Sequence, residues 1–190
     1  MAIRKIARMG HPVLRRPARP VADPRDPEIQ RLIADMIDTM IDANGAGLAA
    51  PQVYESLRLV IFQAPAERAM ADDEWDGETF DQTAPLTVLI NPQIEILDHT
   101  TQPGWEGCLS VPGLRGIVPR YTHIRYSGLD QHSAPIIREA RGFHARVVQH
   151  ECDHLDGIVY PARMSDLGLL IFESELPHLM AASEPADEPI

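Results

Sequence analysis

The residues best suited to chemistry in this chain are five consecutive polar ones near its C-terminal end. Residues 150–154 read His-Glu-Cys-Asp-His, which has the form H-E-x-x-H. On an α-helix, residues four apart lie about 40° apart around the axis and one turn along it, so the imidazoles of His150 and His154 can reach one metal ion. Glu151 lies beside them, near enough to handle a water at the same centre. The pattern predicts a metal site with an acid–base carboxylate.

A catalytic metal site of this kind needs a third protein ligand, and three positions compete for that role. Tyr160 stands where one class of metalloprotease has its third histidine, so that class is a poor match. Glu173 lies near the distance that a second class uses, but in an apolar stretch typical of a buried helix. Cys108 offers a soft thiolate, and the adjacent Gly107 allows the backbone to approach closely. The residues alone leave Glu173 and Cys108 as alternatives.

Two helices are predicted from the spacing of apolar residues. One runs from about Gly142 to Leu155 and carries the H-E-x-x-H motif. An earlier helix has Asp26 as its N-cap, Pro27 at its first position and residues 44–45, Asn-Gly, at its end. Its apolar stripe recurs every three or four residues and consists of Ile29, Leu32, Ile33, Met36, Ile37, Met40 and Ile41.

Between these helices, short runs rich in β-forming residues predict strands. The runs are Leu57–Phe62, Leu86–Leu97, Ile117–Leu129 and Pro135–Glu139. A third helix is expected to follow Ser165 and to stop before Pro177. The order of one helix, several strands and a further helix favours an α+β fold with a mainly antiparallel sheet over alternating βαβ units.

Composition excludes several classes of protein. The chain has 190 residues, of which 44% are hydrophobic and 24% charged, so one globular domain is expected, over residues 1–180. No run approaches the roughly 18 apolar residues of a membrane span. A formal net charge of −11 argues against DNA binding, because phosphate contacts need clustered cations. Two cysteines are too few for a disulfide-stapled scaffold.

Charge is distributed unevenly along the chain. Residues 67–81 hold seven acidic residues against one arginine, which predicts an acidic surface insert over 65–85. Residues 183–190 are expected to form a flexible acidic tail. The basic N-terminal segment resembles a targeting peptide in charge, but a helix of that kind would be broken by Gly10, Pro12, Pro17 and Pro20. We therefore expect a cytoplasmic protein.

Three segments resemble the signatures of peptide deformylases. Residues 45–52 (Gly-Ala-Gly-Leu-Ala-Ala-Pro-Gln) are similar to the first signature, residues 106–110 (Glu-Gly-Cys-Leu-Ser) to the second, and residues 150–154 to the third. They follow the family's order and approximate spacing, and the resemblance extends from about Ile6 to Met164. It implies an α+β fold in which the H-E-x-D-H helix packs against antiparallel sheet. The implied activity is removal of the N-formyl group from the formylmethionine of newly made proteins, with release of formate.

The resemblance also implies roles for individual residues. One divalent ion would be bound by Cys108, His150 and His154, with a fourth position left for water. Fe(II) is the implied native metal, and Zn, Ni or Co could occupy the same site. Glu151 would act as general base, while the side-chain amide of Gln52 and the backbone N–H of Leu109 would stabilise the oxyanion.

Substrate contacts are implied for six further residues. The Gly-rich segment would hold an extended peptide through backbone groups, Arg115 would lie near the pocket mouth, and two apolar residues on the helical face of His150 would line a methionine pocket or simply pack in the core. These residues are Gly45, Ala46, Gly47, Arg115, Phe143 and Val147. Glu106 and Arg120 would form either a pair that positions the Cys108 loop or a plain surface ion pair.

The expected partners are nascent formylated polypeptides, with transient association with the ribosome as a further possibility. An acidic C-terminal end would repel ribosomal RNA, so docking through that end is not expected. Cys152 should point away from the ion, since it lies about 200° around the helix from His150. The remaining histidines are interpreted as surface or packing residues. Two alternatives stay open: a metallopeptidase that uses Glu173 as third ligand, and a closed structural site in an inactive relative.

Overall fold

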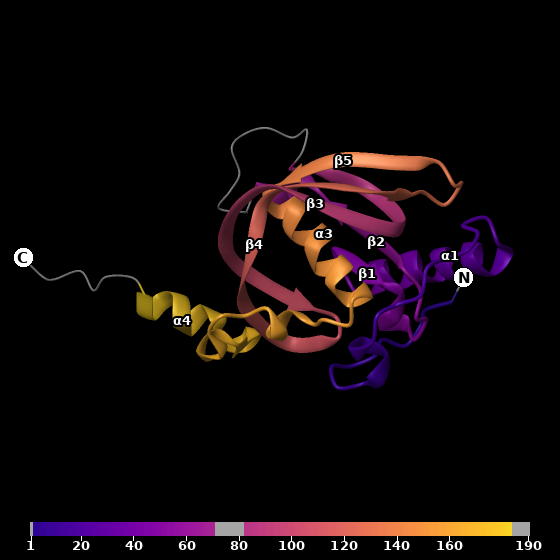
Figure 1. The fold of residues 1–190 in the computed structure, drawn as a ribbon. Helices are drawn as coiled ribbons and strands as arrows, with labels where there is room; N and C mark the ends of the chain where they lie inside the picture. The colour runs from indigo at the N-terminus through magenta and orange to yellow at the C-terminus, as the bar shows by residue number, and fades with distance from the viewer. Residues whose placement is uncertain (1, 71–81, 184–190) are drawn as a thin grey trace, which may run out of the picture.

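One curved antiparallel sheet surrounds a central helix. The computed structural model describes residues 2–70 and 82–183. The sheet has the order β1-β2-β3-β4-β5, with β6 paired to β4 as well. The strands are β1 (Gly47–Ala49), β2 (Leu59–Ala64), β3 (Ala84–Cys108), β4 (Val111–Leu129), β5 (Pro135–Arg141) and β6 (Ile171–Phe172). Figure 1 shows β3 and β4 curling around α3 (Gly142–Leu155). The predicted α+β fold, with the motif helix packed against antiparallel sheet, is confirmed.

The β3–β4 hairpin is the longest feature of the sheet, and it carries the second signature at its turn. Cys108 is the last residue of β3, and Leu109 and Ser110 connect it to β4. The predicted strands Leu86–Leu97 and Ile117–Leu129 cover only the parts of the hairpin far from this turn. The part nearest the turn is rich in proline and glycine, which usually indicate a loop. It is extended here because the two strands pair with each other, without a break from Thr101 opposite Tyr121 to Gly107 opposite Arg115.

β2 is buried on both faces, which places a helix on each side of it. Val60 and Phe62 pack in one apolar cluster with the residues of α3 that face the sheet. Leu59 and Ile61 point the opposite way, into a second cluster formed with α1 (Pro27–Asp42). Because side chains alternate along a strand, this one short segment contributes to both of these apolar clusters.

α1 begins and ends close to its predicted limits. The side chain of Asp26 accepts a hydrogen bond from the backbone N–H of Glu28 (2.7 Å), as expected for an N-cap. At the other end, Asn44 adopts a left-handed conformation with φ 52°, just beyond the helix. The prediction of a buried apolar stripe is wrong for one of its members. Ile41 is 62% exposed, because it lies at the edge of the helix face that packs on β2.

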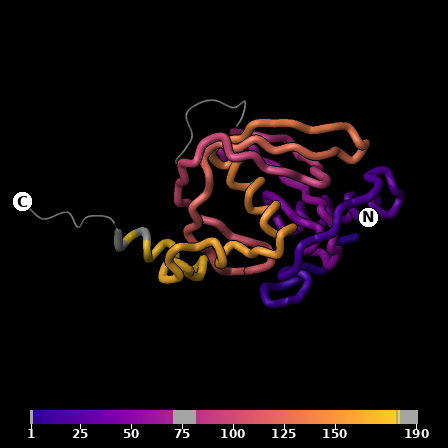
Figure 2. Tube along the Cα trace, in the orientation of Figure 1, coloured from indigo at the N-terminus to yellow at the C-terminus, as the bar shows by residue number. Residues whose placement is uncertain are grey.

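The third predicted helix is also wrong. The segment after Ser165 consists of two 3-10 turns, Leu167–Leu169 and Glu173–Glu175, on either side of β6. A helix, α4 (Leu176–Ser183), begins where the prediction stopped, and Pro177 is its second residue. Proline is tolerated in the first turn of a helix, where its missing N–H would have no partner in any case. Figure 2 shows α4 on the side of the molecule opposite the N-terminal residues.

The acidic insert predicted over 65–85 is described only at its edges. Its first part forms a single helical turn, α2 (Ala66–Ala69), in which Ala69 is buried. Residues 71–81 and the tail from residue 184 onward lie outside the described residues, so these parts of the two predictions stay predictions. Over the ranges that are described, the helices are all too short or too polar to cross a membrane.

Packing of α1 on β2 can be tested with two residues of the same helix. Met36 is fully buried between α1 and the sheet, so Met36→Ala should lower the free energy of unfolding by about 2–5 kcal/mol through a cavity. Ile41→Ala should change it by less than about 0.5 kcal/mol, since that side chain is largely in water. Urea unfolding measures both, and equal losses would contradict the described packing.

Candidate active site

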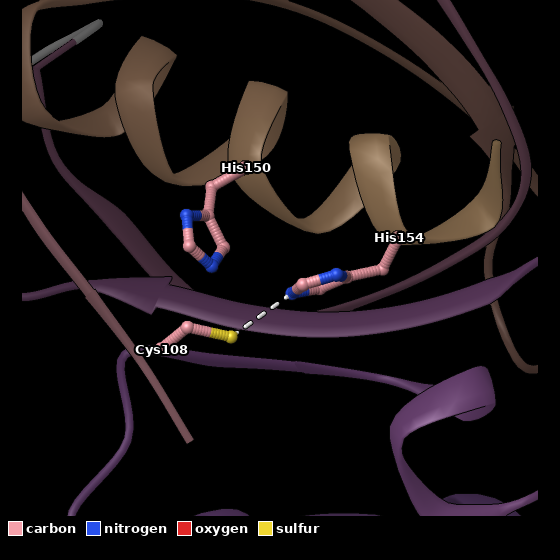
Figure 3. Close-up of side chains that lie close together, drawn as sticks. All are labelled: Cys108, His150 and His154. Atoms are coloured by element: carbon pink, nitrogen blue, oxygen red, sulfur yellow. Dashed lines mark hydrogen bonds between the residues drawn. The ribbon is translucent and has the colours of Figure 1, made fainter. Parts of the chain in front are cut away.

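Cys108 and the two motif histidines come together, although the cysteine lies 42 positions before the first of them in the chain. His150 and His154 project from successive turns of α3, and Cys108 faces them from the end of β3 (Figure 3). One ligand atom from each of the three lies within 4.8 Å of the others, and Cys108 Sγ is 3.3 Å from His154 Nε2. The Cys108–His150–His154 group could therefore hold one metal ion, which is the ligand set that the family resemblance implies.

Each imidazole is oriented by a bond at its far nitrogen. Nδ1 of His150 lies 2.7 Å from Oε2 of Glu106, and Nδ1 of His154 lies 3.1 Å from the backbone oxygen of Ile158. With Nδ1 held in this way, Nε2 is the nitrogen that each ring presents to an ion. A carboxylate or carbonyl behind a ligating histidine also makes the ring a better donor to a metal.

The two neighbouring imidazoles favour the thiolate form of Cys108. Burial opposes ionisation of Cys108, but the neighbouring His154 and His150 outweigh it and hold the pKa of the thiol well below its ordinary value. For His150, burial favours the neutral ring, but Cys108 and Glu106 raise its pKa well above the ordinary value. A thiolate is the form of cysteine that binds metals, so the site already favours its ligand state.

Glu151 lies beside the Cys108–His150–His154 group, and its carboxylate is not fully hydrogen-bonded. Burial raises the pKa of Glu151 to about 7, although the imidazoles of His150 and His154 oppose that shift. Its Oε2 is buried and has no hydrogen-bond partner among the described residues. A Cβ atom at Gly47 would overlap Oε1 of this carboxylate, so any other residue there would displace the Glu151 side chain. Gly47 lies in β1, a short strand that precedes the first of the predicted strands.

A buried network of charges joins the second signature to the third. Arg120, on β4, donates to both carboxylate oxygens of Glu106 (2.8 and 3.0 Å) and to Asp153 Oδ2 (2.6 Å). Arg163 donates to Asp153 from the other side at 2.6 Å. Arg120 is 6% exposed, so the interpretation of Glu106 and Arg120 as a surface ion pair is wrong. The pair instead supports the carboxylate that holds His150.

A hydrogen bond from a nearby backbone N–H orients the side-chain amide of Gln52 toward the site. Its Oε1 accepts the N–H of Ala49 at 2.8 Å, which forces Nε2 to the other side. From there Nε2 donates to Ser110 Oγ (3.2 Å) and to Cys108 Sγ (3.4 Å). Leu109, the other predicted oxyanion donor, lies between those two residues in the hairpin turn and lines the same cleft.

A cleft of about 1080 Å³ opens over the Cys108–His150–His154 group, between α3, β1 and the β3–β4 hairpin. All six predicted substrate residues line it, namely Gly45, Ala46, Gly47, Arg115, Phe143 and Val147. Sequence analysis missed Arg146, which also lines the cleft and donates to the backbone oxygens of Val118 (2.8 Å) and Gln102 (3.0 Å). Its position four residues before His150 was a signal, since it places Arg146 on the same helical face.

The competing third ligands are not part of the Cys108–His150–His154 group. Oε1 of Glu173 accepts a hydrogen bond from Arg115 Nε at 2.6 Å, and Glu173 is not part of the Cys108–His150–His154 group. The ring of Tyr160 stacks on that of His150, with centroids 6.3 Å apart. Cys152 packs in the core behind α3, where burial raises the pKa of its thiol, so it points away from the site as expected. The remaining histidines join no such group within residues 2–70 and 82–183.

A cysteine–histidine–histidine group, a buried carboxylate beside it and an open cleft are the parts of a metal-dependent hydrolase. Comparison with known proteins narrows this class. The family model described as polypeptide deformylase matches residues 3–169. The chain is 56% identical over 164 residues to peptide deformylase 2 of Ralstonia nicotianae, covering 86% of this chain and 88% of that protein. It is 51% identical over 165 residues to peptide deformylase 1 of Nitrosomonas europaea, covering 87% and 89%.

Solved structures agree with the sequence comparison. Peptide deformylase from Thermotoga maritima has a TM-score of 0.75 and 32% identity, covering 87% of this chain and all of that one. A class I type b peptide deformylase from Acinetobacter baumannii, bound to Met-Ala-Ser, has a TM-score of 0.74 and 34% identity, covering 86% and 99%. The chain belongs to the polypeptide deformylase family, whose members remove the formyl group from the N-terminal methionine of new polypeptides.

The buried network can be tested against an exposed one on the same strand. Arg120→Met should lower the free energy of unfolding by about 3–5 kcal/mol, because it leaves Glu106 and Asp153 buried without their shared partner. Arg125→Met also removes an arginine that bridges two carboxylates, but those groups are exposed, so little change is expected. Chemical denaturation of the two variants checks this, and similar losses would contradict the assigned role of Arg120.

Proposed function

We propose that this chain hydrolyses the formamide bond of N-terminal formylmethionine at the cleft over Cys108, His150 and His154, releasing formate. The observation that carries the proposal is the position of Glu151. Its buried carboxylate has an oxygen without a partner among the described residues, beside three groups that can hold one metal ion. An amide hydrolase needs a base at this place, within reach of a water and of the departing amine.

The three donor groups suit a divalent transition metal. Cys108 favours its thiolate form, and both imidazoles present Nε2, as described above. When bound, the ion would supply Lewis-acid polarisation and an acidified water. We propose Fe(II) as the native metal, on the family resemblance, and Zn, Ni or Co as replacements, because a thiolate with two imidazoles accepts all of them.

The substrate would bind as an extra strand. β1 lies at the edge of the sheet and pairs with β2 on one side only. Gly45, Ala46 and Gly47 line the cleft, so backbone groups at this edge can pair with an extended peptide. Phe143 and Val147 would then enclose the methionine side chain. The Acinetobacter baumannii relative is similar in fold and holds Met-Ala-Ser, which has the sequence of a deformylated peptide.

The protein groups around the formyl carbon would have two roles, proton transfer and stabilisation of the oxyanion. Glu151 would take a proton from the attacking water and deliver it to the methionine nitrogen as the carbon–nitrogen bond breaks. The products are formate and a free amine. The Gln52 amide and the Leu109 N–H would donate to the oxygen that becomes negative in the transition state. The Gln52 donor is fixed before substrate binds, since the Ala49 N–H holds its side chain in place.

We further propose that one catalytic domain, over residues 1–180, acts on nascent polypeptides in the cytoplasm. Such a substrate is available while the chain leaves the ribosome, so transient association with the ribosome would serve the reaction. The acidic C-terminal end is a poor candidate for that contact, because ribosomal RNA is anionic.

Removal of the general base should separate catalysis from metal binding. Glu151→Gln keeps the shape of the side chain but cannot accept the proton, so we expect formate release from formyl-Met-Ala to fall by about 10²–10⁴-fold. Metal content, measured by elemental analysis of anaerobically prepared protein, should stay at the wild-type level. Undiminished formate release by the metal-loaded variant would contradict the role of Glu151.

The two cysteines provide a matched test of the metal ligands. Cys108→Ala should lose tightly bound metal, and added Fe(II) or Zn should no longer raise its melting temperature, since only a ligand that binds the folded state stabilises it. Cys152→Ala removes the other thiol and should keep both properties, at some cost in stability from a core cavity. Retention of metal and turnover by Cys108→Ala would show that another residue is the third ligand.

A further inference from the structure

Glu173 is placed at the active-site cleft by the C-terminal part of the chain. β6 pairs with β4 so that Ile171 is opposite Arg115 and Phe172 is opposite Leu114. Glu173 follows directly and accepts a hydrogen bond from Arg115 at 2.6 Å. Both side chains line the cleft, and both are partly exposed, at 43% for Arg115 and 49% for Glu173. The ion pair therefore lies at the mouth of the cleft and not in its floor.

The other charges of the cleft make Glu173 distinctive. Three exposed or partly exposed arginines line it: Arg8, Arg68 and Arg115. Two of the three acidic residues that line it, Glu106 and Glu151, are buried beside the Cys108–His150–His154 group. Within the described part of the chain, Glu173 is thus the one acidic side chain of the cleft that a passing peptide meets in water. Its negative charge offsets part of the positive charge that the three arginines place at the mouth of the cleft.

We propose that Glu173 determines how strongly the enzyme favours acidic residues downstream of the formylmethionine. The inference rests on the proposed function and concerns its substrate preference. By pairing with Arg115, Glu173 lowers the positive potential that the peptide meets at the mouth. Without it, three arginines would attract carboxylates at the positions that follow the first residue, and would repel lysine and arginine there.

The geometry brings these positions close to Arg115. In the β3–β4 register Arg115 is opposite Gly107, the residue before Cys108. Its side chain crosses Gly107, because a Cβ atom there would lie 3.8 Å from Arg115 Cγ. An extended peptide advances about 3.3 Å per residue, so a substrate whose first residue lies at Cys108 would carry its next two residues along the cleft that Arg115 and Glu173 line. Charges separated by less than about one Debye length, roughly 8 Å, still act on each other in salt solution.

The test compares three peptide amides that differ at one position: formyl-Met-Ala-Glu, formyl-Met-Ala-Gln and formyl-Met-Ala-Lys. The readout is the ratio of kcat/KM for the Glu and Lys peptides, from formate release by metal-loaded enzyme. Glu173→Gln should raise this ratio by about 3–10-fold over wild type, and 1 M salt should reduce the difference. Glu175→Gln makes the same charge change two residues further on, outside the cleft lining, and should leave the ratio unchanged.

A double variant separates charge from loss of structure. In Arg115→Gln with Glu173→Gln the ion pair is lost but the net charge of the mouth is that of wild type, so the ratio should return toward the wild-type value. A ratio that stays high would assign the effect to a loosened β6, and a ratio that Glu173→Gln does not raise would overturn the proposal. Absence of formate from all three peptides with wild-type enzyme would instead defeat the proposed function itself.

Discussion

Arg120 holds the two halves of the site together. Its guanidinium bonds Glu106, two residues before Cys108 on β3, and Asp153, one residue before His154 on α3. A single planar group thus sets the distance between the strand that offers the thiol and the helix that offers the imidazoles. The bonds are charge-assisted and buried, so they are strong and well oriented. Removing one member of this network would leave an unpaired charge in the core. That cost disfavours other arrangements of the same side chains.

The same burial produces the chemical character of the site. His150 and Glu151 are buried and Cys108 is partly buried, so their charges act on each other with less screening than charges at the surface. The imidazoles favour a thiolate at Cys108, while burial raises the pKa of Glu151 to about 7. A ligand set and a proton acceptor with different charge states can therefore lie side by side. Gly47 completes the site, because any side chain there would displace the Glu151 carboxylate.

Rigid elements carry the reacting groups, and the edges of the sheet carry recognition. α3 is enclosed by the sheet and by the apolar clusters on β2, so its histidines have little freedom. β1 offers backbone groups at one edge of the cleft, and β6 brings Glu173 to another part of its rim. Because the two are separate, substitutions at the rim can change substrate preference without disturbing the buried network.

Features that depend on neighbouring residues or on a repeated pattern could be predicted from the sequence. The spacing of His150 and His154 on a helix, the cap at Asp26 and the three signatures were all readable, because each depends on residues close in the chain. Tertiary structure decided the rest. That Cys108 and not Glu173 meets the histidines, and that Glu106 and Arg120 are buried, depends on β3 and β4 remaining paired through a stretch rich in proline and glycine. Pairing over such distances is a property of the assembled sheet, where each strand supplies the hydrogen bonds that the other lacks.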